Sequence, residues 1–191
     1  MASLKGSQTE KNLLASFAGE SQARNRYTYF ASVAKKEGYE QISALFEDTA
    51  NNEKEHAKVF FKYLEGGDVE ITAMYPAGVI GDTLANLKAA AAGEKAEWGS
   101  IYPEAARIAR EEGFTDIANS FTQIAAVEAE HEARYNILAE RVEKGEVFSR
   151  AEPIKWRCRN CGRVMEGKEA PQLCPACQHP QAHYEPFCPN Y

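Results

Sequence analysis

The sequence has no long hydrophobic run. Its longest uncharged apolar stretch, around residues 71–87, is interrupted by a proline, two glycines and an aspartate. It therefore falls short of the roughly 20 apolar residues that a helix needs to span a bilayer. The first six residues contain no apolar segment of the kind that directs secretion. We expect no membrane segment and a cytoplasmic protein.

An excess of positive charge is also lacking. Lys and Arg number 22 against 28 Asp and Glu, and the net charge is -6. Because binding to a phosphate backbone needs a basic face, we expect no general nucleic-acid binding. The charge is unevenly placed: residues 153–191 carry +2, from five basic and three acidic side chains, and residues 1–152 carry -8. The chain is an acidic body with a mildly basic tail.

Cysteine is absent from the first 157 residues, and all five cysteines lie after them. A change of composition this abrupt marks a domain boundary. We predict a helical domain over residues 1–146, a linker over 147–152 and a small metal-binding domain over 153–191.

Apolar residues recur at alternating spacings of three and four through the first 145 residues, which is the pattern of amphipathic helices. The pattern predicts a mainly α four-helix bundle, with stripes over residues 13–34, 42–63, 84–94 and 117–142. We place Arg24 on the first stripe, between Glu20 and Tyr27.

Glycines predict how these helices are joined. Gly38 and Gly113 have the position of helix-ending glycines, and each is followed by an aromatic residue. The first two and the last two helices therefore form antiparallel hairpins. The connection around residues 66–78 can extend roughly 46 Å, enough to cross the length of a bundle.

The two hairpins form an internal repeat. Residues 34–39 match residues 109–114 at an offset of 75, and Tyr27 matches Tyr102 at the same offset. In contrast, Ala18-Gly-Glu20 matches Ala92-Gly-Glu94 at an offset of 74. One extra residue must therefore lie in the third helix. We predict a π-bulge near residues 97–99, because helices commonly absorb a single insertion in this way.

A Glu-x-x-His phrase occurs once in each half, as Glu53–His56 and as Glu128–His131, again at an offset of 75. Residues i and i+3 of a helix share a face, so each phrase presents a carboxylate and an imidazole side by side. Glu20 and Glu94 lie within the apolar stripes of the other two helices and add one carboxylate each. Four carboxylates and two imidazoles suit a pair of iron or manganese ions.

A single Glu-x-x-His phrase is commonplace and by itself is more often structural. Here both histidines of the first 150 residues fall in such phrases, on the core stripes and at equivalent positions of the repeat. Buried together without metal, the carboxylates would repel one another. We therefore predict a di-metal site. Glu55 and Glu130, inside the same phrases, point off the stripe and are expected to be solvated.

Three further residues are candidates for catalysis beside this site. Glu97 lies three residues after Glu94, next to the predicted bulge, where the first half has Ala23. It is either a surface residue beside Lys95 or an extra carboxylate that one metal gains or releases. The phenols of Tyr27 and Tyr102 are placed to hydrogen-bond the glutamates or bound oxygen, although both residues would also be ordinary in a core.

The tail predicts a second, different metal site. Cys158 and Cys161, then Cys174 and Cys177, form two Cys-x-x-Cys pairs, a spacing typical of tetrahedral thiolate coordination of iron or zinc. Disulfides are disfavoured in a cytoplasmic protein. Cys188 is left as a free thiol. The four thiolates complete the tetrahedron, so the tail histidines are not expected to bind the metal.

With both sites assembled, the chain resembles the rubrerythrin family along its whole length. The resemblance implies a ferritin-like di-iron bundle followed by a rubredoxin-like Fe(Cys)4 domain. It assigns the di-iron ligands to Glu20, Glu53, His56, Glu94, Glu97, Glu128 and His131. It assigns the single iron to Cys158, Cys161, Cys174 and Cys177.

The resemblance also implies a function. It indicates a peroxidase that reduces hydrogen peroxide to water and protects anaerobic or microaerophilic cells from oxidative stress. One iron would exchange between Glu97 and His56 with redox state, while Glu53 and Glu128 bridge the ions and Glu20 and Glu94 are terminal. The resemblance further implies a head-to-tail homodimer or a higher homo-oligomer, in which the two centres that exchange electrons come from different subunits.

No Gly-x-Gly-x-x-Gly phrase follows a strand, so a nicotinamide or flavin site is lacking. Electrons must therefore arrive from a partner. The resemblance implies that they come ultimately from NAD(P)H, through an external donor such as a rubredoxin or a flavoprotein reductase. Two alternatives stay open. One is a ferroxidase or iron-handling protein, which would gain little from the tail. The other is a non-enzymatic protein whose tail is a zinc ribbon that binds a partner.

Overall fold

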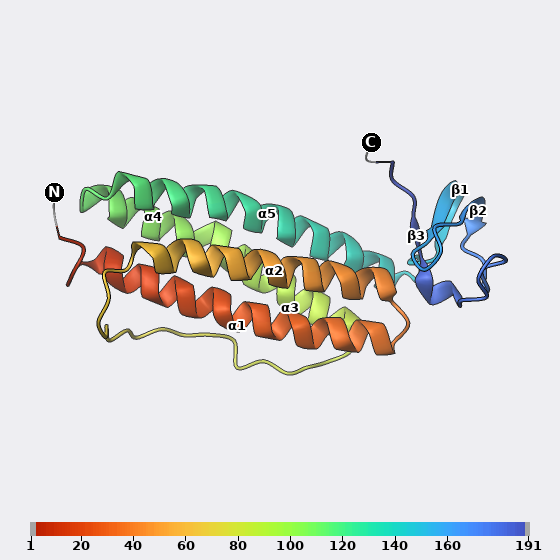
Figure 1. The fold of residues 1–191 in the computed structure, drawn as a ribbon, viewed down its shortest axis with the longest axis horizontal. Helices are drawn as coiled ribbons and strands as arrows, with labels where there is room; N and C mark the ends of the chain where they lie inside the picture. Colours follow the sequence, from red (N-terminus) through yellow and green to blue (C-terminus); the bar gives the residue numbers. More distant parts are fainter. Residues whose placement is uncertain (1–2, 190–191) are drawn as a thin grey trace.

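The computed structural model describes residues 3–189 and shows a long helical bundle with a small sheet at one end (Figure 1). Two helices, α1 (Gln8–Lys36) and α2 (Glu40–Tyr63), form the first hairpin. The second hairpin consists of a broken helix and a long one: α3 (Thr83–Ala96), η1 (Glu97–Ile101), α4 (Tyr102–Glu111) and α5 (Thr115–Glu143). The predicted four-helix bundle is confirmed. No helix within the described residues is long and apolar enough to cross a membrane.

The two hairpin turns have the same geometry. Gly38 and Gly113 have φ values of 84° and 89°, a left-handed conformation that glycine adopts without strain. Each turn closes with a backbone hydrogen bond from the aromatic residue after the glycine, of 2.8 Å from Tyr39 to Ala34 and of 2.7 Å from Phe114 to Ala109. These bonds satisfy carbonyls that the helix ends leave free.

The connection between the hairpins is an extended segment, residues 64–82. It runs beside α1 from one end of the bundle to the other (Figure 1). Tyr75 fastens it by donating a hydrogen bond of 2.6 Å to the carbonyl of Ala15. At its far end the Asp82 side chain caps α3 by accepting from the backbone N–H of Ala85 at 2.7 Å. The long crossover thus places α3 against the first hairpin.

The predicted irregularity in the third helix is present. Between α3 and α4 lies a π-helical turn, Glu97–Ile101, which absorbs the residue that changes the repeat offset from 74 to 75. The stripe on α1 needs one correction: Ala23 is buried and Arg24 is exposed. A helical period of 3.6 allows both the i+3 and the i+4 position after Glu20, and the smaller side chain occupies the buried one.

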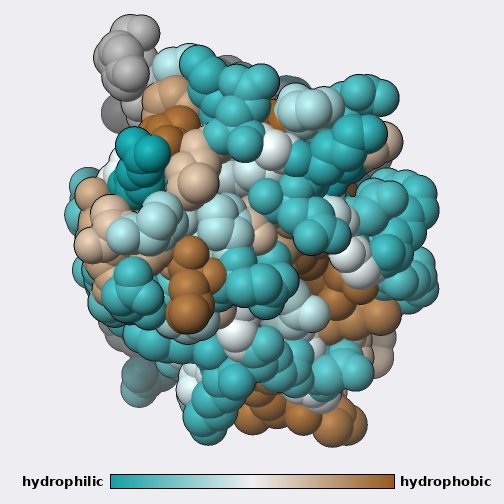
Figure 2. All heavy atoms as spheres, turned by 90° about the vertical axis from the view of Figure 1, so that its right-hand side faces the viewer, coloured by the Kyte–Doolittle hydropathy of each residue, from teal (hydrophilic) through white to brown (hydrophobic). Residues whose placement is uncertain are grey.

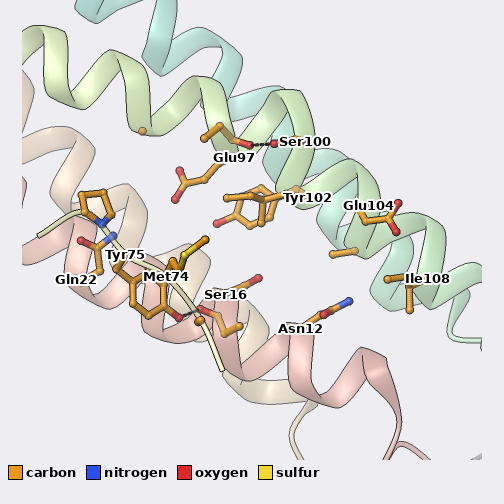
Figure 3. A pocket seen from close by; sticks show the side chains of 18 of the residues that line it. Asn12, Ser16, Gln22, Met74, Tyr75, Glu97, Ser100, Tyr102, Glu104 and Ile108 are labelled. Atoms are coloured by element: carbon orange, nitrogen blue, oxygen red, sulfur yellow. Dashed lines mark hydrogen bonds between the residues drawn. The ribbon is translucent and has the colours of Figure 1, made fainter. Parts of the chain in front are cut away.

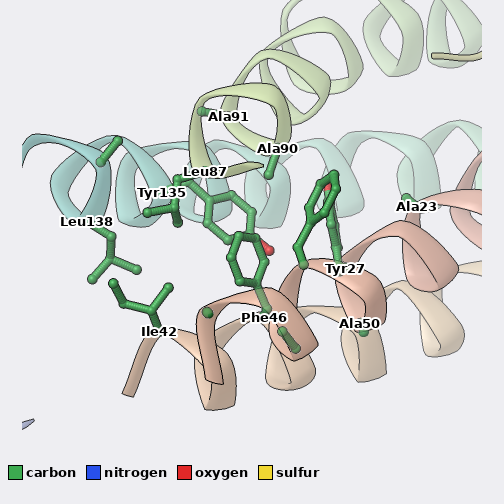
Figure 4. Close-up of a cluster of buried hydrophobic side chains, with 14 of the residues drawn as sticks. Ala23, Tyr27, Ile42, Phe46, Ala50, Leu87, Ala90, Ala91, Tyr135 and Leu138 are labelled. Atoms are coloured by element: carbon green, nitrogen blue, oxygen red, sulfur yellow. The ribbon is translucent and has the colours of Figure 1, made fainter. Parts of the chain in front are cut away.

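Two aromatic clusters flank the middle of the bundle. In one, the rings of Tyr27, Phe46 and Tyr135 lie 5.1–6.2 Å apart in tilted and edge-on contacts (Figure 4). In the other, Phe60, Tyr102 and Phe121 lie 4.8–5.8 Å apart. All six residues are almost fully buried, and each member of one cluster is the repeat equivalent of a member of the other. The packing on the two sides of the middle of the bundle therefore follows the internal repeat of the sequence.

The tail forms a three-stranded antiparallel sheet in the order β2-β1-β3. Its strands are β1 (Ser149–Cys158), β2 (Val164–Glu169) and β3 (Tyr184–Pro186), with a short 3-10 helix, η2 (Gln181–His183), before β3. Phe148 stacks on Tyr39 at 6.1 Å and so joins the sheet to the α1–α2 turn. Because β1 begins at Ser149, part of the segment taken for a linker is strand. The domain boundary remains a prediction.

Candidate metal centres

Six of the seven predicted bundle ligands meet in the middle of the bundle, in two groups that share two residues. One group consists of Glu20, Glu53, His56 and Glu128, and the other of Glu53, Glu94, Glu128 and His131. Within each group, one candidate ligand atom per residue lies within 4.8 Å of all the others. Five of these side chains are buried, and His56 is slightly exposed.

The two shared carboxylates are divided evenly between the groups. The His56 Nδ1 atom lies 2.9 Å from Glu53 Oε2 and 2.9 Å from Glu128 Oε1. The His131 Nδ1 atom lies 2.8 Å from Glu128 Oε2 and 3.4 Å from Glu53 Oε1. Glu53 and Glu128 thus turn one oxygen toward each histidine. This is the geometry of two carboxylates that bridge a pair of ions.

The remaining two carboxylates lie at opposite sides of the pair, each with a phenol beside it. Tyr102 donates a hydrogen bond of 2.6 Å to Glu20, and Tyr27 donates one of 2.5 Å to Glu94. Each phenol thus reaches across to the glutamate of the other half. These bonds hold the terminal carboxylates in a fixed orientation; a catalytic role for the two tyrosines remains a prediction.

The site fits a pair of cations because its own atoms do not satisfy one another. Buried atoms without a hydrogen-bond partner within the described chain include Glu20 Oε2, Glu53 Oε1, Glu94 Oε2, both Glu128 oxygens and His131 Nδ1. Several approach one another closely, but they point toward a common centre rather than along a hydrogen bond. Leaving buried charged oxygens unpaired is costly. Bound divalent ions would satisfy these atoms.

The same conclusion follows from the acidity of the groups. Burial, with the charges of Glu53 and others, raises the pKa of Glu20 well above its usual range and that of Glu94 to about 7. Although burial opposes a charged imidazole, the close carboxylates of Glu128 and Glu53 raise the pKa of His56 to about 9 and that of His131 to about 12. Protons thus compensate the clustered carboxylates when metal is absent.

Glu97, the seventh predicted ligand, belongs to neither group. It begins the π-helical turn and is half-buried. Burial and the nearby Glu94 raise the pKa of its carboxyl group well above the usual range. The side chain lines a cavity of about 590 Å³, together with Tyr102 and with Met74 and Tyr75 of the crossover segment (Figure 3). The structure therefore places Glu97 beside the site, between the ligand groups and a cavity.

Sequence reasoning missed one contact to the ligands. Asn52 Oδ1 lies 3.2 Å from Nε2 of His131, the ring nitrogen that faces away from the carboxylates. This contact joins α2 to α5, so the periodicity along a single helix does not reveal it. A comparison of the two halves would have drawn attention to it, because the repeat equivalent of Asn52 is Val127.

The four cysteines of the tail also converge. Cys158 Sγ lies 3.8 Å from Cys177 Sγ, and Cys161 Sγ lies 3.6 Å from Cys174 Sγ. Metal–sulfur bonds of about 2.3 Å in a tetrahedron place the sulfurs about 3.8 Å apart, whereas a disulfide needs about 2.05 Å. The four thiols are free and fit one tetrahedral ion. Cys188 is exposed and lies outside the group.

Donors around Cys174 and Cys177 favour the thiolate form that binds metal, whereas the pKa of Cys161 is raised to about 12, because a backbone hydrogen bond from Arg163 is outweighed by hydrogen bonding with Cys177 and the other thiols. Hydrogen bonds from the Tyr184 hydroxyl and, after it, from the backbone of Ala176 and Cys177 lower the pKa of Cys174 to about 6. A hydrogen bond from the backbone of His179 lowers the pKa of Cys177. Because several donors point at the sulfurs before any metal is bound, the tail is preorganised as a binding site.

Helices that present paired Glu-x-x-His phrases, with one carboxylate from each partner helix, define the class of ferritin-like di-iron carboxylate proteins. In this chain the class is extended by a four-cysteine metal domain. Comparison with protein families agrees on both parts. The rubrerythrin family model matches residues 11–139, and the model of the rubrerythrin rubredoxin-like domain matches residues 156–185. The chain belongs to the rubrerythrin family.

Individual relatives match over nearly the whole chain. Rubrerythrin from Porphyromonas gingivalis is 65% identical over 99% of this chain and 94% of its own length. Rubrerythrin from Nitratidesulfovibrio vulgaris is 60% identical over 97% of both. Among solved structures, nigerythrin in a mixed-valence state superposes with a TM-score of 0.61 at 29% identity, covering 96% of this chain and 91% of that one.

These comparisons confirm the fold, the family and the two kinds of iron site predicted from the residues. The bundle holds a di-iron carboxylate site, and the tail holds a rubredoxin-like four-cysteine iron site. The protein is accordingly an oxidoreductase of the rubrerythrin family. Which residues bind each iron, and the part played by Glu97, remain predictions.

Proposed function

We propose that this protein is a cytoplasmic non-haem di-iron peroxidase that reduces hydrogen peroxide to water. The observation that carries the proposal is the presence, in one chain, of a two-ion carboxylate site and a four-cysteine site. Reduction of one peroxide consumes two electrons and two protons and yields two waters. A second centre that returns electrons is needed for a reductive cycle, whereas iron storage does not need it.

Different residues are proposed to bind the ions and to supply protons beside them. When bound, two ferrous ions supply the two electrons that cleave the O–O bond. Glu53 and Glu128 would be shared by the two ions, and Glu20 and Glu94, held by hydrogen bonds from Tyr102 and Tyr27, would each bind one of them. The two phenols retain protons beside the reacting centre, because burial raises their pKa values well above the usual range.

Glu97 is the proposed variable ligand. It stands between the ligand groups and the cavity, while His56 is the less buried of the two histidines, with 12% of its side chain exposed against 5% for His131. We infer that one ion takes Glu97 in one redox state and His56 in the other. The cavity beneath the crossover segment is the proposed entrance for peroxide.

Electrons are proposed to pass between chains. The sheet adjoins the α1–α2 turn, and Glu53 lies roughly 21 Å along α2 from Tyr39 of that turn. Because electron transfer weakens steeply with distance, a head-to-tail homodimer that brings the tail of one chain to the bundle of its partner suits the two sites better. The opposite net charges of bundle and tail favour this docking.

The proposed external donor, a rubredoxin or a flavoprotein reductase linked to NAD(P)H, would meet the end of the molecule that carries the sheet. Cys161 is exposed there, whereas Cys158 and Cys174 are buried. Seen from this end, the surface is mainly hydrophilic, with hydrophobic residues in small separate groups (Figure 2). Such a surface suits transient contact with an external donor.

The central test compares oxidants. The iron-loaded protein is reduced anaerobically and mixed with either hydrogen peroxide or oxygen while the absorption of both centres is followed. We expect peroxide to reoxidise both centres faster, with two electrons consumed per peroxide. Faster reoxidation by oxygen, together with accumulation of iron in the protein, would instead establish a ferroxidase.

Exchange of subunits tests the path of the electrons. Glu128→Gln disables the bundle and Cys161→Ser disables the tail. In a head-to-tail dimer, a mixed pair still joins one intact tail to one intact bundle, so mixing the two variants should restore part of the peroxidase activity. No recovery, despite subunit exchange verified by mass spectrometry, would contradict transfer between chains.

A further inference from the structure

The two ligand histidines are held differently at the ring nitrogen that faces away from the carboxylates. The His131 Nε2 atom contacts Asn52 Oδ1 at 3.2 Å. Within residues 3–189, the structure shows no hydrogen-bond partner for Nε2 of His56. Because the amide oxygen only accepts, Nε2 of His131 must carry the hydrogen and Nδ1 is left to face the carboxylates and the metal.

The difference between the two histidines corresponds to a difference between the two halves of the internal repeat. Asn52 precedes Glu53 as Val127 precedes Glu128. The equivalent of Asn52 is therefore an apolar side chain, 38% exposed, which offers no acceptor to His56. The relation between the two halves is otherwise kept at these positions, since both phrases have the same spacing and lie on facing helices.

Contacts beside Asn52 add further hydrogen bonds between α2 and α5 on the side of His131. Arg134 donates to Thr49 Oγ1 at 2.7 Å and to Asp48 Oδ2 at 3.2 Å. Its repeat equivalent is Val59, which has no such donor. Polar side chains thus tie the helices next to His131. On the side of His56 the equivalent residues are the apolar Val59 and Val127, and the polar contact between the helices lies further along, between the hydroxyls of Tyr63 and Ser120 at 2.9 Å.

We propose that Asn52 is a positioning residue that fixes the ring of His131. Asn52 and Val127 then make the two metal positions unequal: His131 is the firmly held ligand, and His56 is free to turn. A ring engaged at both nitrogens cannot rotate without breaking a bond, and such partners of ligand histidines fix the tautomer and the orientation. The inference concerns how metal is held and does not depend on the peroxidase reaction.

The test uses the full chain with zinc in every site, which gives sharp NMR spectra and no redox change. Two quantities are measured: the solvent exchange of the Nε2–H protons of His56 and His131, and the affinities of the two bundle ions by competition with a chelator. In the wild type, the proton of His131 should exchange more slowly. Asn52→Ala should bring its exchange to the rate of His56 and weaken one bundle ion by about 10- to 100-fold.

Three variants make the result specific. Asn52→Asp keeps an oxygen acceptor and should retain slow exchange at His131. Asn51→Ala removes the exposed neighbouring amide and should change nothing. Val127→Asn adds an acceptor on the other side and should slow the exchange at His56. Unchanged exchange and affinities in Asn52→Ala would overturn the proposal. If Asn52→Ala fails to fold, unchanged exchange at His56 in Val127→Asn would overturn it equally.

Discussion

The first hairpin, α1–α2, and the second, α3–α5, build the same site from the same side chains, yet they surround it differently. Each hairpin contributes a terminal glutamate, a Glu-x-x-His phrase, a phenol and an aromatic cluster, at equivalent positions. All the innermost residues obey the repeat. The comparison shows that the requirement for two similar ions constrains the residues that touch them.

The departures from symmetry lie one step outside the ligand groups. The second hairpin has the π-helical turn and Glu97, where the first has an unbroken helix and Ala23. Where α2 packs against α5, the first hairpin has Asn52 at the position where the second has Val127. Asn52 and Val127 are not proposed to bind metal, and Glu97 is proposed to bind one ion in one redox state only. Together they would make the two ions distinguishable. A redox cycle in which one ion changes a ligand needs that distinction.

Removing one of the two carboxylates shared by the ligand groups should disrupt both metal positions of the bundle. Glu128 turns one oxygen toward each histidine, so Glu128→Gln should abolish tight binding of both bundle ions and leave the four-cysteine iron in place. Metal analysis by mass spectrometry gives the count. Glu130→Gln, an exposed residue in the same phrase, is the matched control and should keep three ions per chain. Retention of a full pair by Glu128→Gln would contradict the bridging geometry.

Glu97 is the carboxylate that has no equivalent in the first hairpin. Its removal should make the two hairpins more alike and leave both ions bound. Glu97→Ala should retain both ions but lower kcat/KM for peroxide at least about tenfold, which corresponds to about 1.4 kcal/mol in the barrier. Glu104→Gln, an exposed residue lining the same cavity, should have little effect. Peroxide turnover that survives Glu97→Ala unchanged would show that Glu97 is not a variable ligand.

Removing the phenols tests how far the symmetry extends. Tyr27→Phe and Tyr102→Phe each delete a donor to a buried carboxylate. Because the carboxylate loses a charge-assisted bond, each should lower the free energy of unfolding by about 1.5–3 kcal/mol. The two losses should be similar, since the rings pack in equivalent clusters. A large difference, measured by denaturant unfolding of the metal-loaded proteins, would limit the equivalence to geometry.

The sequence predicts the candidate ligands well because helical periodicity determines which residues that are close along the chain share a face. Glu53 and His56 must share a face once their segment is a helix, and an offset change from 74 to 75 already requires a bulge between Glu94 and Tyr102. Contacts between helices are not tied in this way. The pairing of Asn52 with His131 depends on the rotation of α2 against α5, which no pattern along one helix fixes.

Two other differences have similar causes. Arg24 and Ala23 both fit a helical stripe after Glu20, and only the packed bundle shows that the smaller side chain is buried. The early start of β1 depends on pairing of Ser149 with Glu169 across the sheet, a contact distant in sequence. Composition marked the change from bundle to tail but not the residue at which the strand begins.

The smallest predicted effect lies at the hairpin turns. Gly38→Ala and Gly113→Ala each place a Cβ on a residue with positive φ, which should cost about 1 kcal/mol of unfolding free energy. At Gly38 the added Cβ would lie 3.7 Å from Ala182 of the tail, an ordinary contact, and at Gly113 nothing lies within 4 Å. The two losses should therefore be nearly equal. A clearly greater loss at Gly38 would mean that contact with the tail, and not the backbone alone, constrains the first turn.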